Sequence, residues 1–302
     1  MVVRLHDGAL VETVIIGHER ASTGARRNTV CVSTQVGCRM GCTFCETGTM
    51  GLLANLTAGE IVEQVWHARR LVGAEGVRNV VFMGMGEPLD NYEEVLVALR
   101  ALTHQSMFDM RQSAVTVSTV GLPARIKQLA DDAPGVNLAL SLHAPTQDLR
   151  ARLLPSAAGT EHTLTRLLAA LRYHREASGR GAMIEYIVIH GINDAEEDAR
   201  ALGQVVAEEL SGDGFPGSKT GCGSLHKGAR GYYVNLIPYN PTAVGETHGY
   251  ETPKDAALER MREILTCEFG VKAKVRWSTA KGREVDGACG QLALKSMTSP
   301  SP

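Results

Sequence analysis

Three closely spaced cysteines are the residues of this sequence whose types and spacing best suit chemistry. Cys38, Cys42 and Cys45 follow a β-branched segment and form a C-x3-C-x2-C pattern. A structural zinc site needs a fourth ligand nearby, and the nearest other cysteine, Cys31, lies within the predicted strand itself. Three thiolates can instead hold three corners of an iron–sulfur cube and leave one iron open. A sulfonium cofactor could bind at the open iron and be cleaved there reductively, so the spacing favours an iron–sulfur site.

The remaining cysteines argue against a disulfide framework. The chain has 7 cysteines, an odd number, and Cys222, Cys267 and Cys289 are scattered through its second half. Disulfide frameworks normally have an even number of cysteines and form in oxidising compartments. The N-terminal residues lack the apolar stretch of a secretory signal, and no apolar run approaches the ~20 residues of a membrane span. The chain is therefore expected in a reducing compartment, either the cytoplasm or the interior of an organelle.

The composition describes a folded globular protein without an overall charge signal. The 302 residues are 44% hydrophobic and 21% charged, which excludes disorder and suffices for one large domain or two small ones. The formal net charge is only −2. A nucleic-acid partner would therefore have to be held by a local basic patch, because the field of the whole protein does not attract phosphates.

A glycine-rich segment with a carboxylate follows one of the predicted strands. Gly84, Met85, Gly86, Glu87 and Pro88 come directly after an apolar β-branched run. Ligands bind at the carboxyl ends of strands in open α/β sheets and barrels. A carboxylate preceded by flexible glycines could therefore approach the amino group of a bound cofactor. The alternative is a plain turn between a strand and a helix.

Short β-branched runs alternate with longer segments in which apolar residues recur every three or four positions. This alternation predicts an α/β fold, a parallel sheet or barrel with six strand–helix repeats. The expected strands span residues 29–35, 79–84, 114–118, 136–142, 182–190, 232–237 and 273–278. The expected helices span residues 58–71, 92–102, 122–130, 163–177 and 195–210. A last helix is expected to have Thr252 as its cap and Pro253 and Asp255 in its first turn, and to stop at Gly270.

The chain is expected to hold one main domain with additions. Residues 1–27 predict an N-terminal β extension, with an extended segment over 10–16. Residues 28–295 carry the motifs and show no internal domain boundary. A glycine-rich stretch over 211–230 predicts a surface loop inserted before the sixth strand, and residues 296–302 predict a disordered tail.

The cysteine pattern, with the aromatic Phe44 before its last cysteine, resembles the signature of the radical S-adenosylmethionine (SAM) superfamily. Further segments, in the same order along the chain, resemble the RlmN/Cfr family of radical SAM RNA adenine methyltransferases. These segments begin at Cys31, Ser141, Glu185, Asn235 and Ala288. The matches extend from Glu12 to Ala293. The resemblance implies a partial (βα)6 TIM-like barrel with a short N-terminal β extension, in which the three spaced cysteines hold a [4Fe–4S] cluster and SAM binds beside it.

The resemblance also implies methylation of carbon 2 of an adenine in ribosomal or transfer RNA. In the family, one SAM methylates a cysteine near the C-terminus, which Cys289 matches. A second SAM yields a 5′-deoxyadenosyl radical that takes hydrogen from the S-methyl group, and the resulting methylene radical adds to the adenine. A second cysteine, matched by Cys31, resolves the covalent RNA adduct by forming a disulfide, and a glutamate, matched by Glu12, removes the ring proton. An electron donor such as flavodoxin or ferredoxin is implied as well.

Residues at the ends of predicted strands match positions that contact SAM in the family. They are Gly86, Glu87, Ser118, Ser141, Leu142, His143 and Asn240. A serine or asparagine at such a place can also cap the following helix. In the same way, Cys31 can be an inert buried thiol and Glu12 a solvated strand residue. Gln35 and Asn55 match family positions without an evident role.

The chain also departs from the family. Members that act on ribosomal RNA usually carry an N-terminal accessory domain, so a chain beginning near Glu12 is expected to be a fragment or to have lost that domain. Arg20, Arg26, Arg27 and Arg39 flank the cluster and could contact phosphates or be ordinary solvated charges. Two alternatives are methylation at carbon 8, as in the Cfr branch, and a non-catalytic iron–sulfur protein that binds RNA. A monomer without membrane contact is expected.

Overall fold

A curved eight-stranded sheet organises the computed structural model, which describes residues 1–19, 26–210 and 231–276. Its strand order is β12-β11-β10-β9-β8-β7-β4-β3, and neighbouring strands are parallel except for β3, which is antiparallel to β4. Two short strands, β1 and β2, pair with each other beside it. The strands are β1 (Val2–Arg4), β2 (Leu10–Glu12), β3 (Val14–Glu19), β4 (Arg26–Cys31), β7 (Val77–Phe82), β8 (Val115–Thr119), β9 (Asn137–Ser141), β10 (Ala182–Val188), β11 (Tyr233–Pro238) and β12 (Ala273–Val275).

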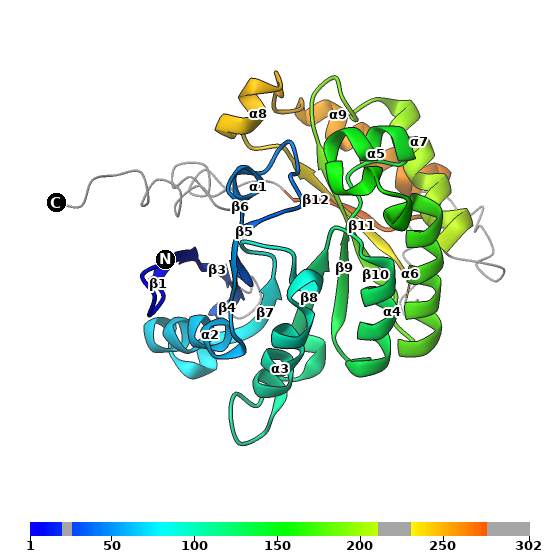
Figure 1. Cartoon of the computed structure of the whole chain (residues 1–302). Helices are drawn as coiled ribbons and strands as arrows, with labels where there is room; N and C mark the ends of the chain where they lie inside the picture. The colour runs from blue at the N-terminus through cyan, green and yellow to red at the C-terminus, as the bar shows by residue number, and fades with distance from the viewer. Residues whose placement is uncertain (20–25, 211–230, 277–302) are drawn as a thin grey trace.

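Helices lie outside the curve of the sheet, and most of them connect one parallel strand to the next (Figure 1). This arrangement confirms the expected α/β architecture of a partial (βα)6 TIM-like barrel. The main helices are α2 (Ala58–Val72), α3 (Tyr92–Thr103), α4 (Pro123–Asp132), α6 (Leu164–Ser178), α7 (Glu196–Gln204) and α9 (Asp255–Glu263).

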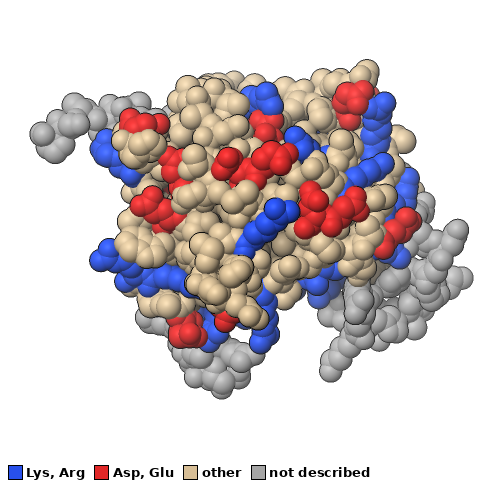
Figure 2. All heavy atoms as spheres, turned by 60° about the horizontal axis from the view of Figure 1, so that its bottom comes forward, with Lys and Arg blue, Asp and Glu red and all other residues tan. Residues whose placement is uncertain are grey.

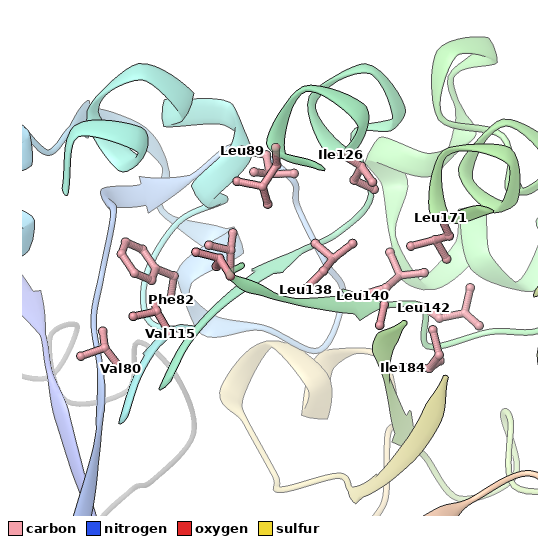
Figure 3. Close-up of a cluster of buried hydrophobic side chains, with 14 of the residues drawn as sticks. Val80, Phe82, Leu89, Val115, Ile126, Leu138, Leu140, Leu142, Leu171 and Ile184 are labelled. Atoms are coloured by element: carbon pink, nitrogen blue, oxygen red, sulfur yellow. The ribbon is translucent and has the colours of Figure 1, made fainter. Parts of the chain in front are cut away.

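Apolar side chains fill the space between the sheet and the helices. Figure 3 shows strand residues such as Phe82 and Leu138 in one cluster with helix residues such as Ile126 and Leu171, and all four are at most 2% exposed. Strands that are covered on both faces read as nearly continuous apolar runs, which explains why the periodicity of the sequence located them. This packing fixes the strand ends, from which the site is built.

The expected strands and helices occur in the expected order, with differences at their ends. The strand expected over 29–35 ends at Cys31, and Gln35 begins a separate strand. The extended segment 10–16 is divided between β2 and β3. Because β3 pairs with β4, the extension shares the main sheet, and the boundary expected after residue 27 falls inside β4.

The start of the last helix differs from the expectation. α9 begins at Asp255 without a side-chain cap, so Thr252 is not its cap and Pro253 lies before its first turn. The Thr252 hydroxyl instead donates to the carbonyl oxygen of Tyr239 at 3.1 Å. This bond ties the segment to the end of β11, a tertiary contact that sequence spacing does not reveal. The helix continues as a π-helical turn, Ile264–Glu268.

Several expected features lie outside the described residues. They are the inserted loop over 211–230 with Cys222, the segment that carries Cys289 and the tail over 296–302. Within the described part of the chain, no helix is long and apolar enough to cross a membrane.

The sequence pattern does not predict several short elements that gather near the carboxyl ends of the parallel strands. β5 and β6 form an antiparallel hairpin, with α1 between them. The short elements are β5 (Gln35–Cys38), α1 (Glu46–Thr49), β6 (Gly51–Asn55), α5 (Gln147–Leu153) and α8 (Ala243–Thr247). They are too short to show a period of their own, and they shape the site.

Candidate active site

A cavity of about 370 Å³ opens at the carboxyl ends of the parallel strands. Loops that follow parallel strands converge at this edge of a barrel. The volume lies within the range of small-molecule sites, roughly 300–1,000 Å³. The cavity residues that the sequence singled out are Cys38, Cys42, Cys45, Gly86, Glu87, Ser118, Ser141, His143 and Asn240.

The β5–β6 hairpin and α1 bring the three spaced cysteines to the cavity. Cys38 ends β5, and Cys45 immediately precedes α1. The loop between them is fixed against α5, because the backbone N–H of Thr43 donates to the carbonyl oxygen of Leu153 at 3.0 Å. All three thiols are free and half-buried, and they face the same cavity.

These thiols are crowded in a way that disfavours their ionisation. Burial raises the pKa of Cys38 to about 12 and raises the pKa of Cys42 and Cys45 above the ordinary value. Negative charge on the neighbouring cysteines raises the pKa of Cys38 and Cys42 further. Three thiolates are therefore unfavourable here without a cationic partner, and such a partner is what metal ions provide.

Two glycines let the loop after β7 pass close to β5. A Cβ atom at Gly84 would lie 2.7 Å from the carbonyl carbon and oxygen of Val32, and one at Gly86 would lie 2.5 Å from Cβ of Gln35. Gly86 also has a φ of 98°, in the left-handed region that other residues avoid. A side chain at either position would push the loop outward and displace Glu87.

The Glu87 carboxylate is buried and held by backbone donors. Its Oε2 accepts from the N–H of Val120 at 2.7 Å, and its Oε1 accepts from the N–H of Leu89 at 3.0 Å. Burial nevertheless raises its pKa to about 7. A cationic group entering the cavity would stabilise the ionised form, so this carboxylate suits a ligand with a charged amino group.

Gln35 and Asn55 gain a structural role that the sequence did not reveal. The fully buried Gln35 accepts the N–H of Glu87 on Oε1 at 2.9 Å, and its Nε2 donates to Asn55 at 2.9 Å and to Asp90 at 3.1 Å. These bonds join the cysteine hairpin to the glycine-rich loop. Arg39, expected to be a possible phosphate contact, forms an ion pair with Asp90.

His143 presents a fixed hydrogen-bond donor to the cavity. Its Nδ1 accepts from the backbone N–H of Ile187 at 3.0 Å, and burial lowers its pKa to about 3. The ring is therefore neutral at physiological pH, with its proton on Nε2. The backbone of His143 has a φ of 60°, and the ring meets Phe44 edge-on with 5.0 Å between centroids. The strained backbone aims the ring toward the cysteine loop.

The other predicted SAM contacts divide into two kinds. Ser141 is the last residue of β9, Ser118 is the last but one of β8, and Asn240 follows β11 by two residues. All three line the cavity. Leu142 does not line it. Its side chain is buried in the core (Figure 3), and its N–H donates to the carbonyl oxygen of Glu185 at 3.0 Å.

Glu185 on β10 is a cavity residue that the sequence reasoning did not assign to the site. It is 4% exposed, and its Oε1 accepts from Nδ2 of Asn235 at 3.1 Å. Its Oε2 has no hydrogen-bond partner in the part of the chain that the structure describes. Burial raises the pKa of Glu185, and the charge of Arg276 opposes this. An O–H or N–H group of a ligand would satisfy the open oxygen; strand alternation alone cannot distinguish such a carboxylate from a solvated one.

Cys31 and Glu12 are buried next to each other beside the cavity. Cys31 pairs with Val14 of β3, and Glu12 precedes Val14 by two residues, so Cys31 lies close to Glu12. Burial raises the pKa of Cys31 to about 12; the N–H of Met83 opposes this shift, and the charge of Glu12 adds to it. Met83 lines the cavity, so Cys31 adjoins its wall although neither Cys31 nor Glu12 lines it. The position of Cys289 falls outside the described ranges.

Residues 32–202 match the radical SAM superfamily. A Salinibacter ruber protein named as a probable dual-specificity RNA methyltransferase RlmN is 42% identical over 292 residues, which cover 96% of this chain and 72% of that protein. The ribosomal RNA large subunit methyltransferase N of Nitrosopumilus maritimus is 38% identical over 295 residues, covering 97% and 76%. The chain belongs to the RlmN family of radical SAM methyltransferases.

Solved structures agree with membership of the RlmN family. A radical SAM methyltransferase from Sphaerobacter thermophilus aligns with a TM-score of 0.80 at 37% identity, over 96% of this chain and 75% of that one. Spore photoproduct lyase aligns with a TM-score of 0.56 at 12% identity, which shows the shared fold alone. The partial barrel is therefore a fold that also occurs in a protein of low sequence identity to this chain.

The cavity suits the cofactors of the radical SAM superfamily, a [4Fe–4S] cluster and SAM. No three His, Cys, Asp or Glu side chains of the described ranges converge to hold a single metal ion. A cube does not need such convergence, because each cysteine binds a different iron. The crowded thiols next to a roomy cavity with a carboxylate and several hydrogen-bonding groups therefore fit an RlmN cluster better than a mononuclear metal.

Proposed function

We propose that this chain transfers a methyl group to carbon 2 of an adenine in ribosomal or transfer RNA. Its relatives are named as dual-specificity and ribosomal RNA methyltransferases. The observation that carries the proposal is the juxtaposition of Cys31 and Glu12 beside a cavity lined by three thiols. A protein that kept the cluster only as a structural element would need neither residue, so this juxtaposition favours catalysis.

The cavity residues divide between the two cofactors. We assign Cys38, Cys42 and Cys45 to three irons of the cluster, and Glu87 to the amino group of SAM. The remaining contacts to SAM come from Gly86, Ser118, Ser141, His143 and Asn240. Leu142, which lies behind the cavity wall, instead supports Ser141 and His143 through its backbone bond to Glu185. When bound, the cluster and SAM together supply a radical that can take hydrogen from an unactivated methyl group.

The mechanism needs a residue that carries the methyl group, because carbon 2 of adenine cannot take it from SAM directly. Carbon 2 of adenine is electron-poor and holds its hydrogen strongly, so it cannot displace a methyl group from a sulfonium. Cys289 instead carries the methyl group, loses one hydrogen atom from it and forms a carbon–carbon bond to the base. The RNA is then joined to Cys289 through a methylene bridge.

Release of the product requires the other two residues. Glu12 accepts the proton that leaves carbon 2, and the electron that the radical adduct loses passes to the oxidised form of an external electron carrier. Cys31, as a thiolate, then attacks the sulfur of Cys289. The sulfur–carbon bond breaks, a proton completes the methyl group, and a disulfide between the two cysteines remains. Because the pKa of Cys31 is about 12, its thiol stays protonated and unreactive until a base removes the proton.

The proposal includes conditions outside the chain. Radical formation needs one external electron, and reduction of the Cys31–Cys289 disulfide before the next turnover needs two more. A donor such as flavodoxin or ferredoxin must therefore dock. The free thiols of the cysteine loop suit a reducing interior, and we place the protein in the cytoplasm or inside an organelle. We propose a monomer, because one chain contains all the residues to which the mechanism assigns a role.

The test is methylation of fractionated total RNA by the anaerobically reconstituted protein, followed by mass spectrometry of nucleosides. The wild type is expected to form 2-methyladenosine and to consume two SAM per product. Cys289→Ala is expected to form none, and Cys31→Ala is expected to accumulate a protein–RNA crosslink. Cys267→Ala, at an exposed cysteine, is the matched control and should retain activity.

Each other outcome has a defined meaning. Methylated RNA from Cys289→Ala would overturn the mechanism. Formation of 8-methyladenosine would move the reaction to carbon 8. No turnover with any RNA, despite an intact cluster and bound SAM, would favour a non-catalytic protein.

A further inference from the structure

Arg150 on α5 is a fully buried arginine with two unpartnered nitrogens. Its exposed fraction is 0%, and its Nη2 donates to the carbonyl oxygen of Val120. Its Nε and Nη1 have no hydrogen-bond partner among the residues that the structure describes. Burying a guanidinium without an anion is strongly unfavourable, so this arrangement calls for a negative partner.

Glu87 is joined to Arg150 through the backbone of Val120, but it does not serve as that negative partner. Glu87 takes the N–H of Val120, while Arg150 takes the carbonyl of the same residue. The two side chains therefore bind different backbone groups of Val120 and do not bond to each other. No ion pair links Arg150 to an acidic side chain in the described ranges. The anionic group there that stabilises its charged form is a cysteine thiolate.

That cysteine is Cys42, the middle member of the cysteine loop. α5 packs directly under this loop, since the backbone N–H of Thr43 donates to Leu153, one turn beyond Arg150. Val120, whose carbonyl oxygen accepts from Arg150, lines the cavity together with Cys42. The side chain of Cys42 also packs against the apolar cluster that contains Val120 and Leu153, so the guanidinium lies on the same side of the cavity as this cysteine. An arginine guanidinium stays protonated in proteins at neutral pH, so Arg150 brings a full positive charge to this side of the cavity.

We propose that Arg150 is the counter-charge of the cluster-bound Cys42 thiolate and raises the reduction potential of the cluster. The inference rests on the assignment of Cys42 as a cluster ligand. Reduction adds one negative charge to the cluster, and a fixed positive charge in a low-dielectric interior stabilises the reduced state more than the oxidised state. The nearby N–H groups can also donate to a thiolate sulfur, which shifts the potential in the same direction. Arg150 is thus a positioning and tuning residue that does not touch the substrate.

The experiment measures the midpoint potential of the reconstituted full-length chain, without SAM or RNA, by a redox titration followed by electron paramagnetic resonance. Arg150→Gln removes the charge and keeps a donor for Val120. Its potential is expected to fall by at least the equivalent of a tenfold change in the reduction equilibrium, about 59 mV for one electron. Arg150→Lys should retain most of the wild-type potential. Arg152→Met, at an exposed arginine on the same helix, is the matched control and should not change it.

An unchanged potential in Arg150→Gln would overturn the proposal. If Arg150→Gln does not retain a cluster, Arg150→Lys decides: a stable cluster with near wild-type potential supports a counter-charge, whereas loss of the cluster in both variants shows a purely structural role and overturns it. Failure of the proposed function is distinguishable, because RNA methylation is not part of the readout. A wild type that holds a cluster but methylates no RNA refutes the proposed function alone.

Discussion

Buried polar groups determine what the cavity accepts. Burial raises the pKa of Glu87 to about 7 and also raises that of Glu185, and it lowers the pKa of His143 to about 3. In each case burial favours the uncharged form, so near neutral pH the Glu87 carboxyl is only partly ionised and the His143 ring is neutral. A ligand with a positive charge would draw both carboxyl groups into their ionised forms. SAM, which carries a sulfonium and an amino group, has this property.

SAM binding to the cluster-loaded protein is expected to weaken at acid pH. The pKa of Glu87 is about 7 in the free protein, so its carboxyl is protonated below that pH and ionised above it. If the carboxylate holds the amino group of SAM, affinity should fall by up to about tenfold per pH unit below 7. It should fall again above about pH 8, where an α-amino group loses its proton. Equilibrium dialysis with labelled SAM between about pH 6 and pH 8.5 measures this slope. Glu87→Gln should bind more weakly at the alkaline end and lose the slope, and a pH-independent wild type would contradict the assignment.

A methyl group at Gly86 is expected to be more harmful than one at Gly8. Both glycines have a left-handed φ, 98° and 89°, but a Cβ at Gly8 meets no atom within 4 Å. Gly8→Ala should therefore lower the free energy of unfolding only by the backbone strain, about 1–2 kcal/mol. Gly86→Ala adds the collision with Gln35, so it should destabilise the chain more and weaken SAM binding. Denaturant unfolding of both variants tests this, and equal losses would show that the close approach does not matter.

At the scale of elements, the periodicity of the sequence suffices to predict the strands and helices of the barrel, because their apolar faces repeat over many residues. Periodicity fails where a tertiary contact determines the environment of a residue. Thr252 looks like a helix cap but donates to Tyr239 instead. Arg150 lies in a helix of seven residues and looks like a solvated charge, yet it is fully buried. The spacing of the three cysteines and the glycine-rich segment before Glu87 mark these residues in the sequence, whereas nothing in the alternation of its strand marks Glu185.

The hairpin of β5 and β6 is expected to depend on Gln35 for its position. Gln35→Ala removes one hydrogen bond to Asn55 inside the hairpin and two that link the hairpin to Glu87 and Asp90. We expect a loss of about 2–4 kcal/mol in the free energy of unfolding, because polar partners remain buried and unpaired. SAM affinity and cluster retention should fall with it. Gln105→Ala, at an exposed glutamine, is the control; a Gln35 variant as stable as this control would contradict the structural role.

At the scale of the whole molecule, charge is the property least suited to RNA binding. The net charge is −2, and on the face shown in Figure 2 basic and acidic side chains are interspersed. Arg39, near the cavity, is paired with Asp90. Affinity for RNA must therefore come from a few local phosphate contacts together with recognition of the target adenine.

RNA binding is accordingly expected to show a shallow salt dependence. Two to four phosphate contacts would reduce the association constant by about 10- to 150-fold between 50 and 200 mM salt, since the slope scales with the number of contacts. Fluorescence anisotropy with a labelled RNA that the protein methylates measures it on the full chain. A fall of a thousandfold or more would require six or more contacts and hence a concentrated basic surface. That result would contradict the inference from charge.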